Sequence, residues 1–235
     1  MISEHQFAGG YASVWHSVAP LSDGFWQVEN RLTARFAPPL ASKAPASLRG
    51  LVNETAFSAF CELQPAASSI DRATIQAAVD AALPNALAYV NRFVTARSLT
   101  VADFDDSCRR EAGHLVLRLL HFFLGRPRIQ VRPAFSGCGL ISACEGDLVV
   151  DGCLYEIKAG ERGFRVTDLR QLLVYSALAY ASRSLGFHKV GLLNPRTGVE
   201  WTRTLDDLCT ALGGARANDL LPTLVTHFSQ VSISR

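Results

Sequence analysis

The sequence lacks the features that would place it in a membrane or outside the cell. Its N-terminus has neither the basic flank nor the apolar stretch of a secretory signal, so we expect a cytoplasmic protein. No run reaches the ~18 uninterrupted apolar residues of a membrane span. The most apolar segment, Leu115 to Leu124, is broken by Arg118 and His121. We therefore expect no membrane role.

The sequence also lacks a cysteine-based metal motif and an excess of charge of one sign. Six cysteines are present, but Cys138, Cys144 and Cys153, which lie closest together, form no C-x-x-C pair. They are better interpreted as small buried apolar residues than as zinc or iron–sulfur ligands. The net charge of +2 neither requires nor excludes a polyanionic partner, because a local basic groove can serve in a near-neutral protein.

What is present is enough apolar sequence for a compact fold in two parts. Of the 235 residues, 49% are hydrophobic and 19% charged, which is typical of a folded globular protein. The composition changes around Pro65 to Ser69, and we divide the chain into an N-terminal region of unknown role (1–98) and a second domain (99–235). The N-terminal region is expected to be an extension of mixed helix and strand.

Within the N-terminal region, aromatic residues between positions 10 and 40 alternate with turn residues, which predicts short strands. After a proline-containing loop, residues 51–63 are predicted to form a helix. Ser68-x-x-Asp71 resembles a capping box, so a helix should begin there and run to about Ala82. Pro84 should interrupt it, with a second helix continuing to Arg97.

The second domain has the pattern of an α/β layer. Thr100-x-x-Asp103 predicts the start of a long amphipathic helix that ends near Gly125. The expected elements after it are a strand over 128–131, a hairpin around Asp151-Gly152, a helix over 169–184, strands over 188–193 and 199–204, and helices over 205–212 and 218–227. This order predicts a central mixed β-sheet flanked by helices.

The hairpin brings charged residues together. If Asp151-Gly152 is a two-residue turn, Val150 faces Cys153, and Asp147 faces Glu156 three pairs further out. One more step of two residues sets Glu145 opposite Lys158. Because side chains alternate along a strand, all four charged residues should project from one face.

Two opposed carboxylates destabilise an ordinary sheet, and a divalent cation would resolve the repulsion. Mg²⁺ binds through one or two carboxylates with water and phosphate in the remaining positions. A lysine beside Asp147 and Glu156 could orient a water or stabilise charge on a phosphate. The alternative is that these are solvated charges on an exposed sheet face, with Glu145 and Lys158 forming a cross-strand salt bridge.

Three elements in order, Gly146-Asp147, Glu156-Ile157-Lys158 and the Gln171-to-Tyr175 segment, resemble the PD-(D/E)XK nuclease superfamily, particularly its RecB-like branch. The resemblance covers roughly residues 105 to 205. It implies a restriction-endonuclease-like core in which Asp147 and Glu156 bind the metal and Lys158 positions or activates the attacking water. It places Gln171 and Tyr175 near the site, with Gln171 completing the catalytic set and Tyr175 contacting nucleic acid. The alternative is a core Tyr175 and a surface Gln171.

The resemblance also implies Mg²⁺ or Mn²⁺ as cofactor, with the Ile157 carbonyl as a further ligand. An additional acid often comes from the preceding helix; Glu111 is the candidate, and His114 a weaker one that is more readily structural. The sequence departs from the family pattern where Glu145-Gly146 replaces the proline before Asp147. The cysteine cluster of the iron–sulfur relatives is absent, which removes that cofactor.

Basic residues gather between Lys158 and the following helix. Arg162, Arg165 and Arg170 could follow a phosphate backbone there. With Glu161 and Asp168 beside them, they could equally form a solvated start of the helix.

We therefore expect a metal-dependent nuclease that hydrolyses phosphodiester bonds in nucleic acid, with DNA preferred, in defence against foreign DNA or in repair. The partner is nucleic acid, and the resemblance allows a helicase or ATPase partner as well. One alternative is a catalytically inactive nuclease-like fold that binds nucleic acid or acts as a scaffold subunit. Another is an unrelated α/β protein with an accidental match, in which Gln171 would lie far from Asp147.

Overall fold

The computed structural model describes residues 1–64, 70–93 and 97–230, and within them the chain is an α/β protein built on a mixed sheet. Six strands lie in the order β1-β8-β7-β6-β5-β2, and only β6 and β7 run parallel. Two further strands, β3 and β4, form a separate antiparallel pair. The strand bounds are β1 Ala34–Arg35, β2 Ile129–Val131, β3 Ala134–Phe135, β4 Cys144–Glu145, β5 Leu148–Val150, β6 Cys153–Ile157, β7 Lys189–Asn194 and β8 Val199–Thr204.

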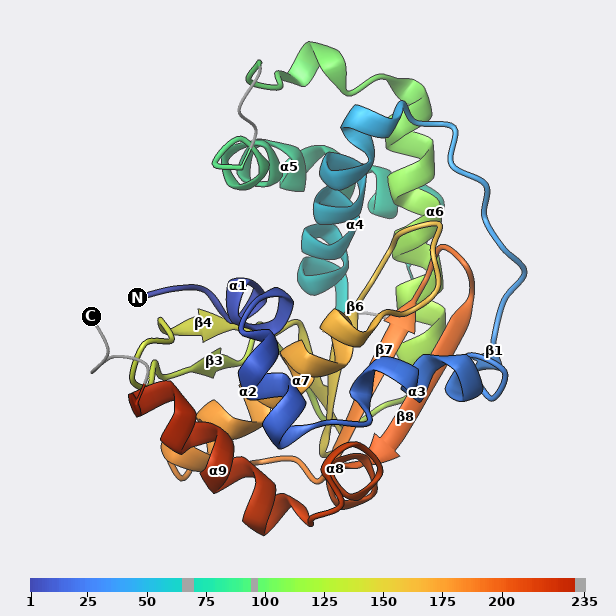
Figure 1. Cartoon of the computed structure of the whole chain (residues 1–235). Helices are drawn as coiled ribbons and strands as arrows, with labels where there is room; N and C mark the ends of the chain where they lie inside the picture. The colour runs from blue at the N-terminus through green and yellow to red at the C-terminus, as the bar shows by residue number, and fades with distance from the viewer. Residues whose placement is uncertain (65–69, 94–96, 231–235) are drawn as a thin grey trace.

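Helices cover both faces of the sheet (Figure 1). Leu148, Val150 and Tyr155 point into one core with α4, α5 and α6, while Leu154 and Val190 point into another with α7 and α9. The central strands therefore carry apolar residues on both faces, as expected of strands that are buried on both sides. The helix bounds are α1 Glu4–Gly9, α2 Ala12–Val18, α3 Ser22–Glu29, α4 Arg49–Leu63, α5 Arg72–Val90, α6 Asp106–Phe123, α7 Val166–Ala181, α8 Leu205–Gly213 and α9 Ala217–Gln230.

The prediction of short strands between positions 10 and 40 is wrong for most of that segment. It forms α2 and α3, with α1 just before them, and only β1 is extended. Most of the aromatic residues in this segment pack into the core of α7 and α9 instead: Trp15 contacts Phe7 edge-on, and Trp26 lies 5.2 Å from Trp201 between ring centroids. Phe36 packs on Phe122 of α6 in the other core. Tertiary packing decides the local structure here.

The next helices differ from prediction at their ends. The Asp71 side chain accepts from the Thr74 N–H and caps α5, which then continues through Pro84 to Val90. Ser68, the predicted partner in the capping box, lies outside the described residues. The Thr100 capping box is present, but it begins a single 3₁₀ turn over Val101–Asp103, and α6 starts afterwards with its own cap, Asp105.

The hairpin prediction is confirmed near its turn. Asp151 and Gly152 both have positive φ, 49° and 78°, as a type I′ turn requires. The register pairs Val150 with Cys153 and continues two pairs further. The prediction fails at the open end, because Glu145 leaves the sheet and pairs with Ala134 of β3. Glu145 therefore does not face Lys158.

Tyr155 spans three strands of the sheet. Its hydroxyl donates to Glu200 on β8 at 2.8 Å, and its ring crosses β7 over Gly191. A Cβ added at Gly191 would lie 2.7 Å from the Tyr155 ring. The close crossing is therefore possible only without a side chain at position 191.

Both cores draw on both parts of the chain. Phe7 and Phe228 share one core, and Leu51 and Leu119 share the other. In the core that contains Leu51 and Leu119, α6 packs along α4 and α5. All six cysteines are free thiols, buried or half-buried. Among the described residues, no helix combines the length and apolar character that a membrane crossing needs.

Candidate active site

Asp147 and Glu156 lie at the ends of neighbouring strands, where the hairpin opens. Asp147 directly precedes β5, and its Oδ2 accepts a hydrogen bond of 2.6 Å from the Ile157 N–H. Glu156 lies near the end of β6 with only 6% of its surface exposed. Glu156 is therefore not a solvated charge on an open sheet face, whereas Glu145 is exposed.

Lys158 follows β6 and is held by two hydrogen bonds. Its Nζ donates to Glu156 Oε1 at 2.8 Å and to Gln171 Oε1 at 2.8 Å. The ammonium also lies 4.0 Å from Asp168. The salt bridge of Lys158 is thus with Glu156 and not with Glu145.

Gln171 links the lysine to the sheet beyond it. This side chain, on the second turn of α7, is buried and donates from Nε2 to the Tyr175 hydroxyl at 2.9 Å. Tyr175 in turn donates to the Glu145 carbonyl at 3.3 Å and stacks on Phe135. Tyr175 is 2% exposed and is therefore a core aromatic, so the prediction of a nucleic-acid contact does not fit its position. Gln171 is not a surface residue.

The electrostatics of the group follow from its burial and from the closeness of two carboxyl groups. Desolvation, together with the negative charge of Glu156, raises the pKa of Asp147 well above its usual value. Burial alone would lower the pKa of Lys158, but Glu156 and the other carboxylates outweigh it and the pKa is raised. Lys158 is therefore an ammonium at neutral pH, and one cation serves two neighbouring carboxylates.

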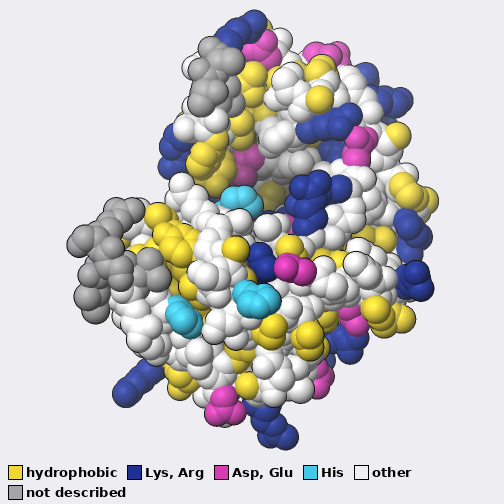
Figure 2. Space-filling model, viewed as in Figure 1, with side chains coloured by type: hydrophobic (Ala, Val, Ile, Leu, Met, Phe, Trp, Pro, Cys, Tyr) yellow, Lys and Arg dark blue, Asp and Glu magenta, His cyan; other side chains and the backbone are white. Residues whose placement is uncertain are grey.

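The group opens onto a pocket of about 290 Å³ between the sheet and α4. Asp147, Ile157 and Lys158 form one wall, and Asn53 and Glu54 of α4 form the other. Figure 2 shows the hollow in this face of the molecule. A polar pocket of this size admits a phosphate group with its water.

The donor set fits a hard divalent cation. Glu156 Oε2 is buried and has no hydrogen-bond partner, which is costly for a carboxylate oxygen unless something binds it. Asp147 and the Ile157 backbone offer further oxygen donors. In the described part of the chain, no three His, Cys, Asp or Glu side chains are grouped for metal binding. Two carboxylates with water and substrate oxygens is the arrangement that Mg²⁺ commonly accepts.

Glu111, the predicted additional ligand, is engaged elsewhere. Its Oε1 accepts from Arg196 at 2.6 Å and from Ser42 at 2.9 Å, and its Oε2 accepts from the N–H groups of Lys43 and Ala44. These bonds saturate the carboxylate, so we leave Glu111 out of the metal site. His114 is exposed on α6 beside α5 and is likewise left out.

The three arginines divide into two kinds. Arg162 donates to both Asp168 oxygens, at 2.9 and 3.1 Å, and Arg170 donates to Asp23 at 2.8 Å while lying over the Trp15 ring. Both therefore help to hold the start of α7. Arg165 is exposed beside them. Arg165 is thus the exposed member of the set, while Arg162 lines the pocket beside Lys158.

Three residues of the site were not anticipated. Glu54 of α4 lines the pocket, and its charge contributes to the raised pKa of Asp147. Glu4 of α1 accepts from Gln171 Nε2 at 3.5 Å. Arg132 donates its backbone N–H to the Asp147 carbonyl at 2.9 Å and its side chain to Glu54. None of them belongs to a spacing motif, and a sequence signal for them is lacking.

No family model matches the chain, and a comparison with curated proteins gives no significant match.

Proposed function

We propose that this protein is a metal-dependent nuclease with a restriction-endonuclease-like core of the PD-(D/E)XK type. The observation that supports it most directly is that Asp147 and Lys158 line one pocket, with Glu156 and Gln171 both hydrogen-bonded to the lysine. An accidental match would leave Gln171 far from Asp147. In the structure Gln171 accepts from Lys158 Nζ, and Asp147 accepts from the N–H of Ile157, the residue before that lysine.

Asp147, Glu156 and the Ile157 carbonyl would hold Mg²⁺ or Mn²⁺. When bound, the metal supplies a Lewis acid for the phosphate and lowers the pKa of a water. As an ammonium, Lys158 would donate hydrogen bonds, orienting a water or stabilising the charge that develops on the phosphate oxygens. Gln171 fixes the lysine in that position, and Tyr175 fixes Gln171.

The proposal is tested by cleavage of plasmid and linear DNA with Mg²⁺, with Mn²⁺ and with EDTA. Wild-type protein should cut in either metal and stop in EDTA. Lys158→Ala should lower the rate by about 10²-fold or more, as for other lost charge-stabilising donors. Lys189→Ala, which removes an exposed lysine on β7, should cut like wild type. Equal cutting by Lys158→Ala would overturn the proposal.

A second candidate is an inactive nuclease-like fold that binds nucleic acid as a scaffold subunit. It is favoured by the internal pairing of two cations, Lys158 with Glu156 and Arg162 with Asp168. It predicts DNA binding without cleavage under any metal condition. For the active form, we propose a cytoplasmic role in defence against foreign DNA or in repair, alone or with a helicase or ATPase.

A further inference from the structure

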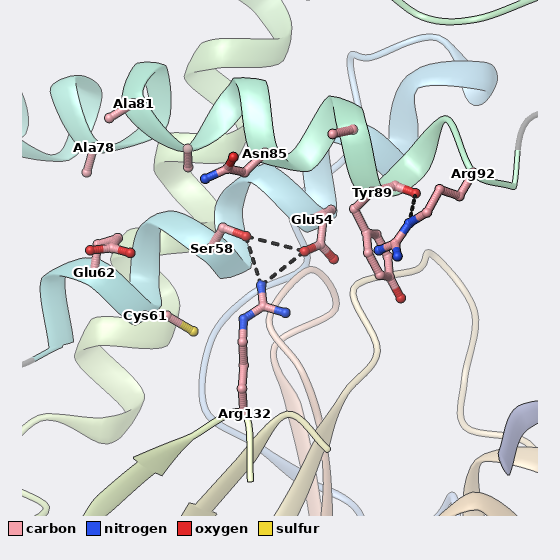
Figure 3. Close-up of a pocket in the computed structure, with 12 residues that line it drawn as sticks. Glu54, Ser58, Cys61, Glu62, Ala78, Ala81, Asn85, Tyr89, Arg92 and Arg132 are labelled. Carbon is pink, nitrogen blue, oxygen red and sulfur yellow. Dashed lines mark hydrogen bonds and ion pairs between the residues drawn. The ribbon is translucent and has the colours of Figure 1, made fainter. Parts of the chain in front are cut away.

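A second, larger cavity of about 710 Å³ lies between α4 and α5 (Figure 3). Its floor is made of small apolar side chains of α5. Polar and aromatic groups stand around them. The polar and aromatic lining residues include Glu54, Glu62, Asn85, Tyr89, Arg92 and Arg132. A cavity of this size holds a ligand as large as a nucleotide.

The cavity is joined to the candidate active site through two residues. Glu54 lines both cavities. Arg132 ties its backbone to Asp147, and its guanidinium points into the larger cavity, where it donates to Glu54 at 3.1 Å and to Ser58 at 3.0 Å. Arg132 also has a left-handed backbone, with φ at 48°, an uncommon conformation for a residue with a side chain. A ligand in the larger cavity would therefore lie next to the scissile phosphate.

A partly exposed tyrosine, with an arginine over its ring, lines this cavity. Tyr89 is 42% exposed, with Phe93 beside it at 5.3 Å between ring centroids. The Arg92 guanidinium lies 4.6 Å from the Tyr89 ring centre. Burial, and then the negative charge of Glu54, raises the pKa of Tyr89; Glu4 and Asp147 contribute as well. Tyr89 lines the same cavity as Glu54, and Glu54 also lines the pocket of the candidate active site.

These groups match the parts of a nucleotide. An exposed ring with an arginine beside it is the usual platform for stacking an unpaired base. Arg92 can meet a phosphate, whereas Arg132 is already paired with Glu54 through Nη2 and could reach one only with its other guanidinium nitrogens. Asn85 and Glu62 offer hydrogen-bonding groups for a base edge. A base paired in a duplex would have to unpair and unstack before it could enter, at a cost of a few kcal/mol.

We propose that the cavity between α4 and α5 binds an unpaired nucleotide next to the scissile phosphate, so that the substrate is single-stranded DNA or a single-stranded end. This rests on the proposed nuclease function and specifies its substrate class. Tyr89 stacks on the base, and Arg132 connects the bound nucleotide to the metal-binding carboxylates.

The test measures binding without cleavage. A fluorescein-labelled single strand of about 12 nucleotides, and the same sequence as a blunt duplex, are titrated with the full chain in EDTA while anisotropy is recorded. Wild type should bind the single strand more tightly. Tyr89→Ala should weaken that binding by about tenfold, because a stacked base is lost. Tyr89→Phe keeps the ring and should bind like wild type.

Tyr180→Ala is the matched control, since Tyr180 is a similarly exposed tyrosine on α7. It should change the dissociation constant by less than about twofold. Wild-type affinity in Tyr89→Ala, or a duplex bound as tightly as the single strand, would overturn the proposal. Because the titration contains no metal, its outcome is independent of cleavage. If the protein binds in this way but never cuts DNA, the cavity assignment stands and only the nuclease proposal is contradicted. If the protein cuts DNA but does not show this binding, only the cavity assignment is contradicted.

Discussion

Lys158 Nζ lies 2.8 Å from Oε1 of Glu156, while Oε2 of the same carboxylate is buried without a partner. The lysine and a metal would therefore occupy different oxygens of one side chain. Glu156→Gln should weaken Mn²⁺ binding roughly tenfold or more, because a charged ligand is lost. Lys158→Ala should bind Mn²⁺ at least as tightly as wild type, since a competing cation is removed. Calorimetric titration with Mn²⁺ separates the two; weaker binding in Lys158→Ala would contradict this assignment.

Gln171 and Tyr175 should differ in their effects although they share a hydrogen bond. Gln171→Ala removes the acceptor that fixes Lys158, so we expect kcat to fall by about 10-fold to 100-fold with little change in KM. Tyr175→Phe keeps the ring stacked on Phe135 and loses one hydroxyl, so kcat should change by less than about threefold. Steady-state cleavage kinetics give both values. A larger fall in kcat for Tyr175→Phe would show that the hydroxyl takes part in the site.

Arg165 and Arg170 form a matched pair of arginines, one exposed and one packed. Arg165→Ala should weaken DNA binding and reduce its salt dependence by about one phosphate contact. Arg170→Ala removes a cation that lies over Trp15 and bonds Asp23, so it should lower thermal stability instead. Anisotropy at several salt concentrations and a melting curve distinguish the outcomes. The reverse pattern would show that Arg170 is the phosphate contact.

The buried pair of Glu111 and Arg196 should be a stability element. Arg196→Met leaves a buried carboxylate without its cation and should destabilise the fold by about 3–5 kcal/mol. The double variant Glu111→Gln/Arg196→Met should recover part of that loss. Urea unfolding measures both. If Glu111→Gln alone instead weakened Mn²⁺ binding without lowering stability, Glu111 would have to be assigned to the metal site.

Stability should also fall in acid because of Glu111. Burial alone would raise its pKa, but hydrogen bonds from the backbone of Lys43 and Ala44 and from Arg196 outweigh it, and the pKa lies below its ordinary value of 4.5. A carboxyl with a lowered pKa stabilises the fold above that ordinary value, and the contribution is lost as the pH falls through the folded pKa. Urea midpoints between pH 6 and roughly pH 3 should decline less steeply in Glu111→Gln.

The parts of the fold that could be predicted are those that depend on local chemistry. Asp151-Gly152 fixes a type I′ turn, and alternation from that turn fixes three pairs of the ladder. The prediction failed two residues beyond Asp147, where the chain leaves to pair with β3. That departure depends on a partner strand and not on the turn. Hence Asp147 and Glu156 could be placed together from sequence, and Glu145 could not.

The helices at the N-terminus and the role of Glu111 could not be predicted because both depend on distant contacts. Trp15 and Trp26 occupy helices too short to be stable alone, and they are fixed by packing against later parts of the chain. Glu111 finds its cation 85 residues away, on the turn between β7 and β8. Glu54 and Arg132 carry no motif at all. Spacing along the chain contains none of this information.

The crossing of Tyr155 over Gly191 has an evolutionary consequence. Any side chain at position 191 would collide with the ring. A smaller residue at position 155 would leave a cavity above the glycine and would remove the hydroxyl that donates to Glu200. Neither position can change alone at low cost. Because Thr202 also lies 2.9 Å from a Cβ added at position 191, a larger residue there would need smaller residues at both 155 and 202. In relatives of this chain the three positions should therefore substitute together, and that covariation would identify proteins that share this sheet.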